Sequence, residues 1–169
     1  MAVDLFTFVE LYDRTLVSVA HLLDKGEAFA AERGLDADDM LSWRLAEDMH
    51  PLRFQASVVV NFSRSWTARV VGLPVPASLD PAVDIAGLRA GIADARAYLA
   101  ALTRDQFAGR DDLPLAVQIT ETMTPIFPAG QWLSVFATTN IYFHLSMVYA
   151  ILRMKGVEIG KIDLFAGRL

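Results

Sequence analysis

The sequence predicts an all-α protein, a four-helix bundle with a small β-hairpin inserted before the last long helix. Three observations carry this prediction. Long segments repeat apolar residues every three or four positions, as helices with one buried face do. A run of 21 residues, from Trp132 to Leu152, holds no charged side chain, which is typical of a helix surrounded by other helices. One short stretch before that run alternates apolar and polar residues, as a strand does.

The first helix is predicted from about residue 4 to residue 33, where Gly34 ends it. One face is an apolar stripe, made of Leu5, Phe8, Tyr12, Leu16, Val19 and Leu23. The other face is polar and carries Arg14, Ser18, His21 and Lys25. Because a catalytic or metal-binding imidazole is expected to face a pocket, we interpret His21 as a solvated residue with a structural role.

The second helix is predicted to begin near Pro51, after a short segment over residues 35–45. Proline is tolerated in the first turn of a helix, and the carboxylate of Asp48 could cap the free amides there. The helix continues to about Val71, and its core-facing residues are Leu52, Val59, Phe62, Trp66 and Val70. Gly72 and the proline-containing stretch 73–77 then break the helical pattern.

The third helix is predicted to follow Asp80 and Pro81, which offer a cap and a first turn. Its apolar residues are three or four positions apart: Ile85, Leu88, Ile92, Ala95, Leu99 and Leu102. This spacing gives a narrow seam of the kind that packs along a neighbouring helix.

A hairpin is predicted between Leu113 and Phe127, and residues 128–130 interrupt the pattern after it. The uncharged helix then runs from about Gln131 to Lys155 and stops at Gly156. The remaining tail is too apolar for a solvated end, so we expect it to fold back over the bundle. Its apolar residues are Val157, Ile159, Ile162, Leu164 and Phe165.

The uncharged run is long enough to span a bilayer. However, it contains several hydroxyl-bearing residues, and no second segment of comparable length exists to bundle with it. We therefore predict a core helix and no membrane partner.

The composition of the chain excludes several classes of function. A chain of 169 residues suits one domain, here residues 1–169, with a single core. The net charge of −5 and the scattered basic residues exclude a nucleic-acid surface. The chain has no cysteine, so thiolate catalysis and cysteine metal sites are excluded. The amino-terminal residues lack a signal or transit pattern, so we expect a cytoplasmic protein.

Asn140 and His144 are the strongest functional signal in the sequence. Residues four apart lie on the same face of a helix, so a carboxamide and an imidazole would sit side by side in apolar surroundings. Buried polar groups need a hydrogen bond, a metal or a wet pocket. We predict that His144 lines a polar pocket, or else is a hydrogen-bonded core residue, and that Asn140 bonds across helices. Gln55, one turn into the second helix, could line the same pocket.

Three segments carry a resemblance to a known family: residues 44–52, residues 140–153 and residues 156–161. They resemble an uncharacterised bacterial family within the DinB/YfiT-like superfamily, over nearly the whole chain. The resemblance implies a four-helix bundle that is often a homodimer. Members of the superfamily include proteins assigned as metal-dependent hydrolases and as thiol-dependent transferases and isomerases.

The resemblance also implies a metal site of three imidazoles, one from the second helix and two from a His-x-x-x-His pair on the last helix. Here His50 matches the first position loosely and His144 matches one of the pair, while Asn140 stands where the other histidine is expected. Three imidazoles leave an open position at which a metal can activate water. An amide oxygen is a poor ligand for zinc or nickel, so Glu47 or Asp48 would have to supply a carboxylate. Either could equally orient His50 or favour the helix start.

Three functions remain open from the sequence. The first is a metal-dependent hydrolase or thiol-dependent transferase, with a divalent metal (Zn or Ni) bound by His50 and His144. The second is a non-catalytic bundle that binds a small molecule and has lost its metal. The third is a structural homodimer, in which a second subunit packs against the Ser134, Thr138, Tyr142 and Ser146 side of the last helix. The chain lacks a nucleophile elbow, a phosphate-binding loop, a dinucleotide fingerprint and a His-Glu-x-x-His motif.

Overall fold

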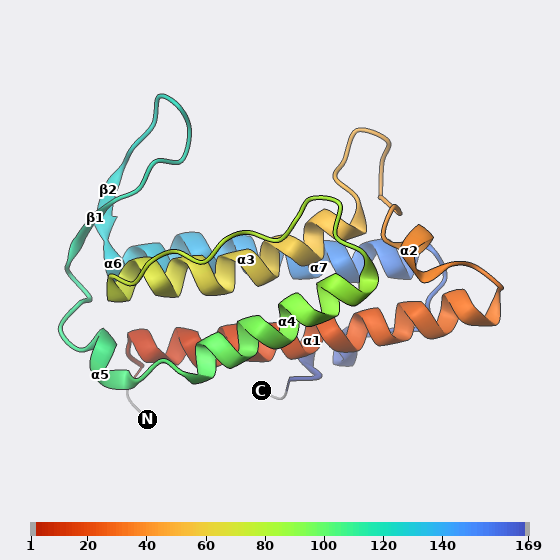
Figure 1. Ribbon diagram of the computed structural model, residues 1–169, viewed down its shortest axis with the longest axis horizontal. Coiled ribbons are helices and arrows are strands. Elements are labelled where there is room, and N and C mark those ends of the chain that lie inside the picture. The colour runs from red at the N-terminus through yellow and green to blue at the C-terminus, as the bar shows by residue number, and fades with distance from the viewer. Residues whose placement is uncertain (1–2, 168–169) are drawn as a thin grey trace.

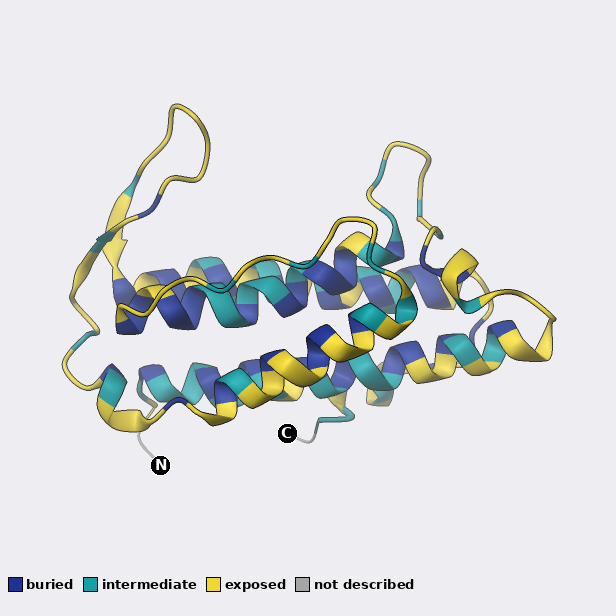
Figure 2. Ribbon diagram, in the orientation of Figure 1, coloured by how far each residue is buried: buried dark blue, intermediate teal, exposed yellow. Residues whose placement is uncertain are grey.

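Four long helices form a bundle, and the structure, a computed structural model, describes residues 3–167. The helices are α1 (Leu5–Glu32), α3 (Leu52–Val71), α4 (Ile85–Ala100) and α7 (Thr138–Met154). Figure 1 shows two layers, with α1 and α4 below α3 and α7, and contacts join α1 to each of the other three helices. The prediction of an all-α four-helix bundle is confirmed. Buried residues line the inner faces of both layers (Figure 2).

Helix α1 begins with a capping box. The Asp4 carboxylate accepts a hydrogen bond from the Thr7 backbone N–H at 3.1 Å, and the Thr7 hydroxyl accepts one from the Asp4 backbone N–H at 3.2 Å. The predicted range of this helix is confirmed. His21 is not a freely solvated residue, however, because its Nε2 lies 2.7 Å from Oδ1 of Asp163 in the carboxy-terminal tail. The backbone N–H of Gly160, followed by His21, lowers the pKa of Asp163.

Helix α3 starts and ends as predicted, but Asp48 does not cap it. Pro51 is the N-cap residue, and no side chain bonds to the first amides. Instead the backbone N–H of Leu52 donates to the Trp43 carbonyl at 2.7 Å, and that of Arg53 donates to the Leu41 carbonyl at 3.0 Å. The preceding turn therefore satisfies the free amides that a carboxylate would otherwise bind.

Helix α4 begins four residues later than Asp80 and Pro81 predicted. Asp84 is the N-cap residue, and its carboxylate accepts a hydrogen bond from the third amide of the helix at 2.7 Å. Asp80 instead closes a tight turn by accepting a bond from the Ala82 backbone N–H at 2.7 Å. Both aspartates can cap, and the second one starts the helix.

The predicted hairpin is confirmed and projects from one end of the bundle (Figure 1). Leu115 pairs with Phe127 in an antiparallel register. The Trp132 indole N–H donates to the Leu115 carbonyl at 2.9 Å and so ties the hairpin to the last helix. The smaller elements around it are α2 (Ala37–Met40), α5 (Arg104–Phe107), β1 (Pro114–Ala116) and β2 (Ile126–Pro128).

The last helix is continuous but not uniformly α-helical. It starts as α6 (Ala129–Gln131), widens into the π-helix η1 (Trp132–Ala137) and continues as α7. In the widened turn the Leu133 carbonyl accepts hydrogen bonds from the Thr138 backbone N–H, from the Tyr12 hydroxyl at 2.9 Å and from the Thr138 hydroxyl at 2.7 Å. Tyr12 is fully buried, and burial raises the pKa of its phenol.

We expect Tyr12→Phe to lower the free energy of unfolding by about 1 kcal/mol, because it removes a buried hydrogen bond while Thr138 still satisfies the Leu133 carbonyl. Urea titration followed by circular dichroism measures this. Tyr142→Phe is the matched control, since Tyr142 is 40% exposed, and we expect a change within about 0.5 kcal/mol. Equal effects of the two substitutions would contradict a role for the π-helix carbonyl.

The tail folds back over the bundle, as predicted. Val157 and Ile159 are buried, and the Ser18 hydroxyl of α1 donates to the Leu164 carbonyl at 2.8 Å in η2 (Lys161–Phe165). Ile162, in contrast, is 85% exposed. One side of the tail therefore packs against the bundle, and the other side faces solvent.

Within the described residues, one helix is long and apolar enough to cross a membrane by length and composition alone: Ala129–Met154, the whole of α6, η1 and α7. In its most apolar window, 33% of the residues are buried inside the bundle. The other residues of this helix are half-buried or exposed, and no charged side chain occurs among them before Arg153.

Candidate functional site

The predicted site residues meet between the start of α3 and the middle of α7. The His144 Nδ1 atom lies 2.7 Å from Oε1 of Gln55. The Gln55 amide nitrogen donates to the His50 backbone carbonyl at 2.9 Å. Gln55 is only 3% exposed, so it is a buried link between two residues far apart in sequence.

These two bonds fix the protonation of His144. Because the Gln55 nitrogen is used by the His50 carbonyl, its oxygen faces His144 as an acceptor, and the imidazole must donate from Nδ1. Nε2 is then the unprotonated nitrogen, free to accept a hydrogen bond or bind a metal. Burial, and then the charge of His50, lowers the pKa of His144 to about 4, so the ring is neutral near pH 7.

Aromatic rings surround His144. The His50 ring stacks on Phe54 with centroids 3.9 Å apart, and Phe54 meets the His144 ring edge to face at 5.9 Å. The Phe143 ring is 5.1 Å from the His144 ring and nearly perpendicular to it. Phe54 and Phe143 are 38% and 53% exposed, so they form an open aromatic rim around a half-buried imidazole.

Asn140 lies one turn from His144, as predicted, but it does not bond across helices. Its amide nitrogen donates to the Phe136 carbonyl of its own helix at 2.7 Å. That bond orients the carboxamide, and its oxygen remains available as an acceptor on the same face as His144.

Glu47 and Asp48 do not join this cluster. Both are exposed in the loop before α3, and only the Glu47 backbone carbonyl is engaged, by Arg44 at 3.3 Å. Within residues 3–167, no three His, Asp or Glu side chains gather closely enough to hold one metal ion. The donor set here is two imidazoles and an amide, which differs from the three imidazoles that the resemblance implies.

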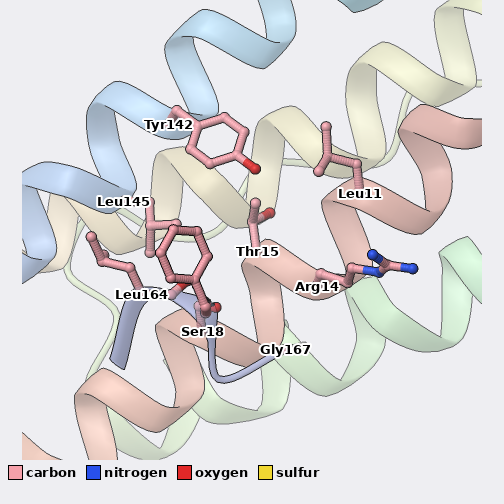
Figure 3. A pocket seen from close by; sticks show the side chains of 9 residues that line it. Leu11, Arg14, Thr15, Ser18, Tyr142, Leu145, Leu164 and Gly167 are labelled. Carbon is pink, nitrogen blue, oxygen red and sulfur yellow. Dashed lines mark hydrogen bonds between the residues drawn. The ribbon is translucent and has the colours of Figure 1, made fainter. Parts of the chain in front are cut away.

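The cluster lies on an open face of the molecule. The four best-formed cavities among residues 3–167 are lined by other residues than His50, Asn140 and His144. One of them, of about 50 Å³, lies where the tail crosses α1 and α7 (Figure 3). Thr15 and Ser18 line it, but both hydroxyls already donate to backbone carbonyls, so it offers mainly an apolar wall.

Sequence reasoning missed Phe54 and Phe143 as parts of the site. The available signal was their position, since Phe54 lies one turn after His50 and Phe143 precedes His144. At helical spacing, aromatic residues are usually core, and only their exposure in the structure separates these two from the buried aromatics of the bundle.

Comparisons with known proteins agree with this fold. Residues 6–165 match the family described as a domain of unknown function, DUF1993. The chain belongs to this family. The DUF1993 chain is also similar to a solved structure, a DinB family member from Shewanella denitrificans, with a TM-score of 0.85 and 29% sequence identity. The match covers 95% of this chain and 90% of that one. No curated protein matches the DUF1993 chain.

Proposed function

We propose that this DinB-like protein binds a small molecule at the face formed by His144, Asn140 and Phe54, and does so without a catalytic metal. The observation that supports the proposal is the Gln55 link, which holds His144 neutral with Nε2 directed away from its partner. We further propose that it works in the cytoplasm, as the sequence suggested.

The chemistry of the site defines the class of ligand. His144 Nε2 and the Asn140 oxygen are both hydrogen-bond acceptors, so the ligand must bring O–H or N–H donors. Phe54 and Phe143 offer partly exposed aromatic surface beside them. A small molecule with an aromatic or apolar body and a neutral donor group fits this arrangement.

The second candidate is the metal-dependent hydrolase or thiol-dependent transferase that the superfamily implies. Two imidazoles share Phe54, and the free Nε2 of His144 is the kind of nitrogen that binds zinc or nickel. The third ligand is the weak point, because an amide oxygen binds these metals poorly and the nearby carboxylates are exposed in a loop. The residues therefore do not fit a hydrolytic metal centre.

The test compares benzyl alcohol with toluene, which has the same ring and no donor. We expect benzyl alcohol to shift the ring resonances of His144 in heteronuclear NMR and to raise the melting temperature progressively as its concentration increases, by mass action. We expect toluene to do neither. Asn140→Ala should abolish both responses, and His144→Phe should abolish the rise in melting temperature, because each removes an acceptor.

Two results would overturn the proposal. Equal responses to benzyl alcohol and toluene would show that the acceptors play no part in binding. Near-stoichiometric zinc or nickel in protein purified without a tag, lost in both His50→Ala and His144→Ala, would replace the proposal with the metalloenzyme.

A further inference from the structure

Both carboxamides of the candidate site bond a backbone carbonyl through their nitrogen. The Gln55 nitrogen donates to the His50 carbonyl at 2.9 Å. The Asn140 nitrogen donates to the Phe136 carbonyl at 2.7 Å. A carbonyl only accepts hydrogen bonds, so a carboxamide that turned over would place its oxygen against another oxygen. Each of the two side chains therefore presents its oxygen on the side away from that carbonyl.

The Gln55 oxygen determines where the single proton of the neutral His144 ring lies. It is 2.7 Å from Nδ1, and Gln55 is only 3% exposed. A proton on Nε2 would leave an unprotonated Nδ1 facing the oxygen at this distance, with a buried acceptor on each side and no hydrogen between them. The proton therefore lies on Nδ1, and Nε2 is an acceptor.

The consequence for a ligand is a choice of sign. Nε2 of His144 and the oxygen of Asn140 are both acceptors, and they lie one helical turn apart on one face of α7. A carboxylate is also only an acceptor, so its oxygens would lose water and gain no hydrogen bond from these two atoms. The net charge of −5 on the chain further disfavours an anion.

We propose that Gln55 is the positioning residue that sets the specificity of this site: acting through His144, it makes the site accept neutral N–H and O–H donors and exclude carboxylates. The inference rests on the proposed function and deepens it, because it assigns the choice of ligand to a buried residue behind the imidazole. The amide of Gln55 is in turn oriented by the His50 carbonyl, in the loop before α3. The backbone of that loop thus determines the hydrogen-bonding character of a side chain on α7.

A structural role for Gln55 makes a different prediction. If Gln55 only joined α3 to α7, its replacement would weaken the binding of every ligand alike. If it sets the position of the proton, its replacement must weaken the binding of donors and strengthen the binding of carboxylates. The two roles can therefore be separated by the sign of the effect.

The first test needs no ligand, since long-range proton–nitrogen NMR reports which ring nitrogen of His144 is protonated. We expect Nδ1 in the natural protein near pH 7. Gln55→Met keeps the length of the side chain but has no strong acceptor, so we expect the proton to move to Nε2, on the open side of the ring. Gln55→Glu keeps an acceptor opposite Nδ1, which should stay protonated.

The matched control is Gln131→Glu, which makes the same replacement at an exposed glutamine of the last helix, about 20 Å from His144 along the helix axis. It should leave the proton on Nδ1. Circular dichroism should give the same helical content for the natural protein and all three variants. If Gln55→Glu does not fold, Gln55→Met and the control decide the test.

The second test compares indole, whose N–H is a donor only, with benzoate, whose carboxylate is an acceptor only. In NMR titrations the natural protein and Gln131→Glu should bind indole, and neither benzoate nor N-methylindole. Gln55→Met should bind indole at least about tenfold more weakly, and benzoate at least about tenfold more tightly, than the natural protein, as expected for one hydrogen bond lost or gained.

Three results would overturn the inference: a proton that stays on Nδ1 in folded Gln55→Met, a natural protein that binds benzoate as tightly as indole, or a Gln55→Met variant that changes its affinity for both ligands alike. The proposed function fails separately. If the proton moves as expected but the natural protein binds neither indole nor benzyl alcohol, Gln55 still positions the proton of His144 and only the proposed function is wrong.

Discussion

Replacing Trp132 with alanine should lower the free energy of unfolding by about 3–5 kcal/mol. The side chain is 1% exposed, its ring stacks on Trp66 with centroids 4.9 Å apart, and its indole N–H holds the Leu115 carbonyl of the hairpin. The substitution thus opens a cavity and removes the indole donor from a strand carbonyl. Chemical denaturation followed by far-ultraviolet circular dichroism measures the loss.

Two further variants separate the parts of this effect. Trp132→Phe keeps an aromatic ring but loses the bond to Leu115, so we expect a smaller loss of about 1–3 kcal/mol. Phe127→Ala, at a hairpin residue that is 38% exposed, should cost about 1 kcal/mol or less. If Phe127→Ala were as damaging as Trp132→Ala, the hairpin rather than the bundle core would be the source of stability at this end.

Acid should destabilise the protein through His144. Its pKa is about 4 in the folded chain and ordinarily 6.5, so the unfolded chain binds the proton more readily between these values. The contribution of His144 to stability is therefore full above about pH 6.5, falls as the pH drops to about 4, and is constant below that. Allowing for the partial exposure of the ring, we expect a loss of about 1–2 kcal/mol over this window.

The quantity to compare between the natural protein and a control variant is the change in unfolding free energy with pH, not the unfolding free energy at one pH. His144→Gln removes the titrating group, so its unfolding free energy should change less between pH 7 and pH 4 than that of the natural protein. Carboxylates with lowered pKa, such as Asp163, lose their contribution at lower pH and act in both proteins. Parallel curves for the two proteins would show that His144 is protonated in the folded chain like an ordinary histidine.

The helices could be predicted because each follows one period over many residues. Leu5, Leu16 and Leu23, for example, lie on one stripe of α1 and are all buried. The start of α4 could not be fixed in this way, since Asp80 and Asp84 offer equivalent local signals and the choice depends on packing. The sequence pattern did not predict the π-helix, whose Leu133 carbonyl bonds the Tyr12 hydroxyl from 121 residues away.

The parts of the candidate site that lie within one helix could be predicted from the sequence. Spacing alone placed Asn140 and His144 on one face. It could not show that Asn140 bonds within its own helix, or that His144 bonds Gln55, 89 residues earlier in the chain. The protonation state of His144 follows from that long-range bond and from burial, and neither is a property of a local segment.

The π-helix also sets the rotational phase of the last helix. Leu133 and Ile141 are both fully buried, although eight residues in an unbroken α-helix would separate their directions by about 80°. If the wide turn absorbs one residue, the separation falls to about 20°, so both side chains face the core. A chain with one residue fewer in this turn and ordinary α-helical geometry would keep both Trp132 and His144 where they are. The hairpin end and the histidine end of the molecule are thus connected by a segment that can change length by one residue without turning one end relative to the other.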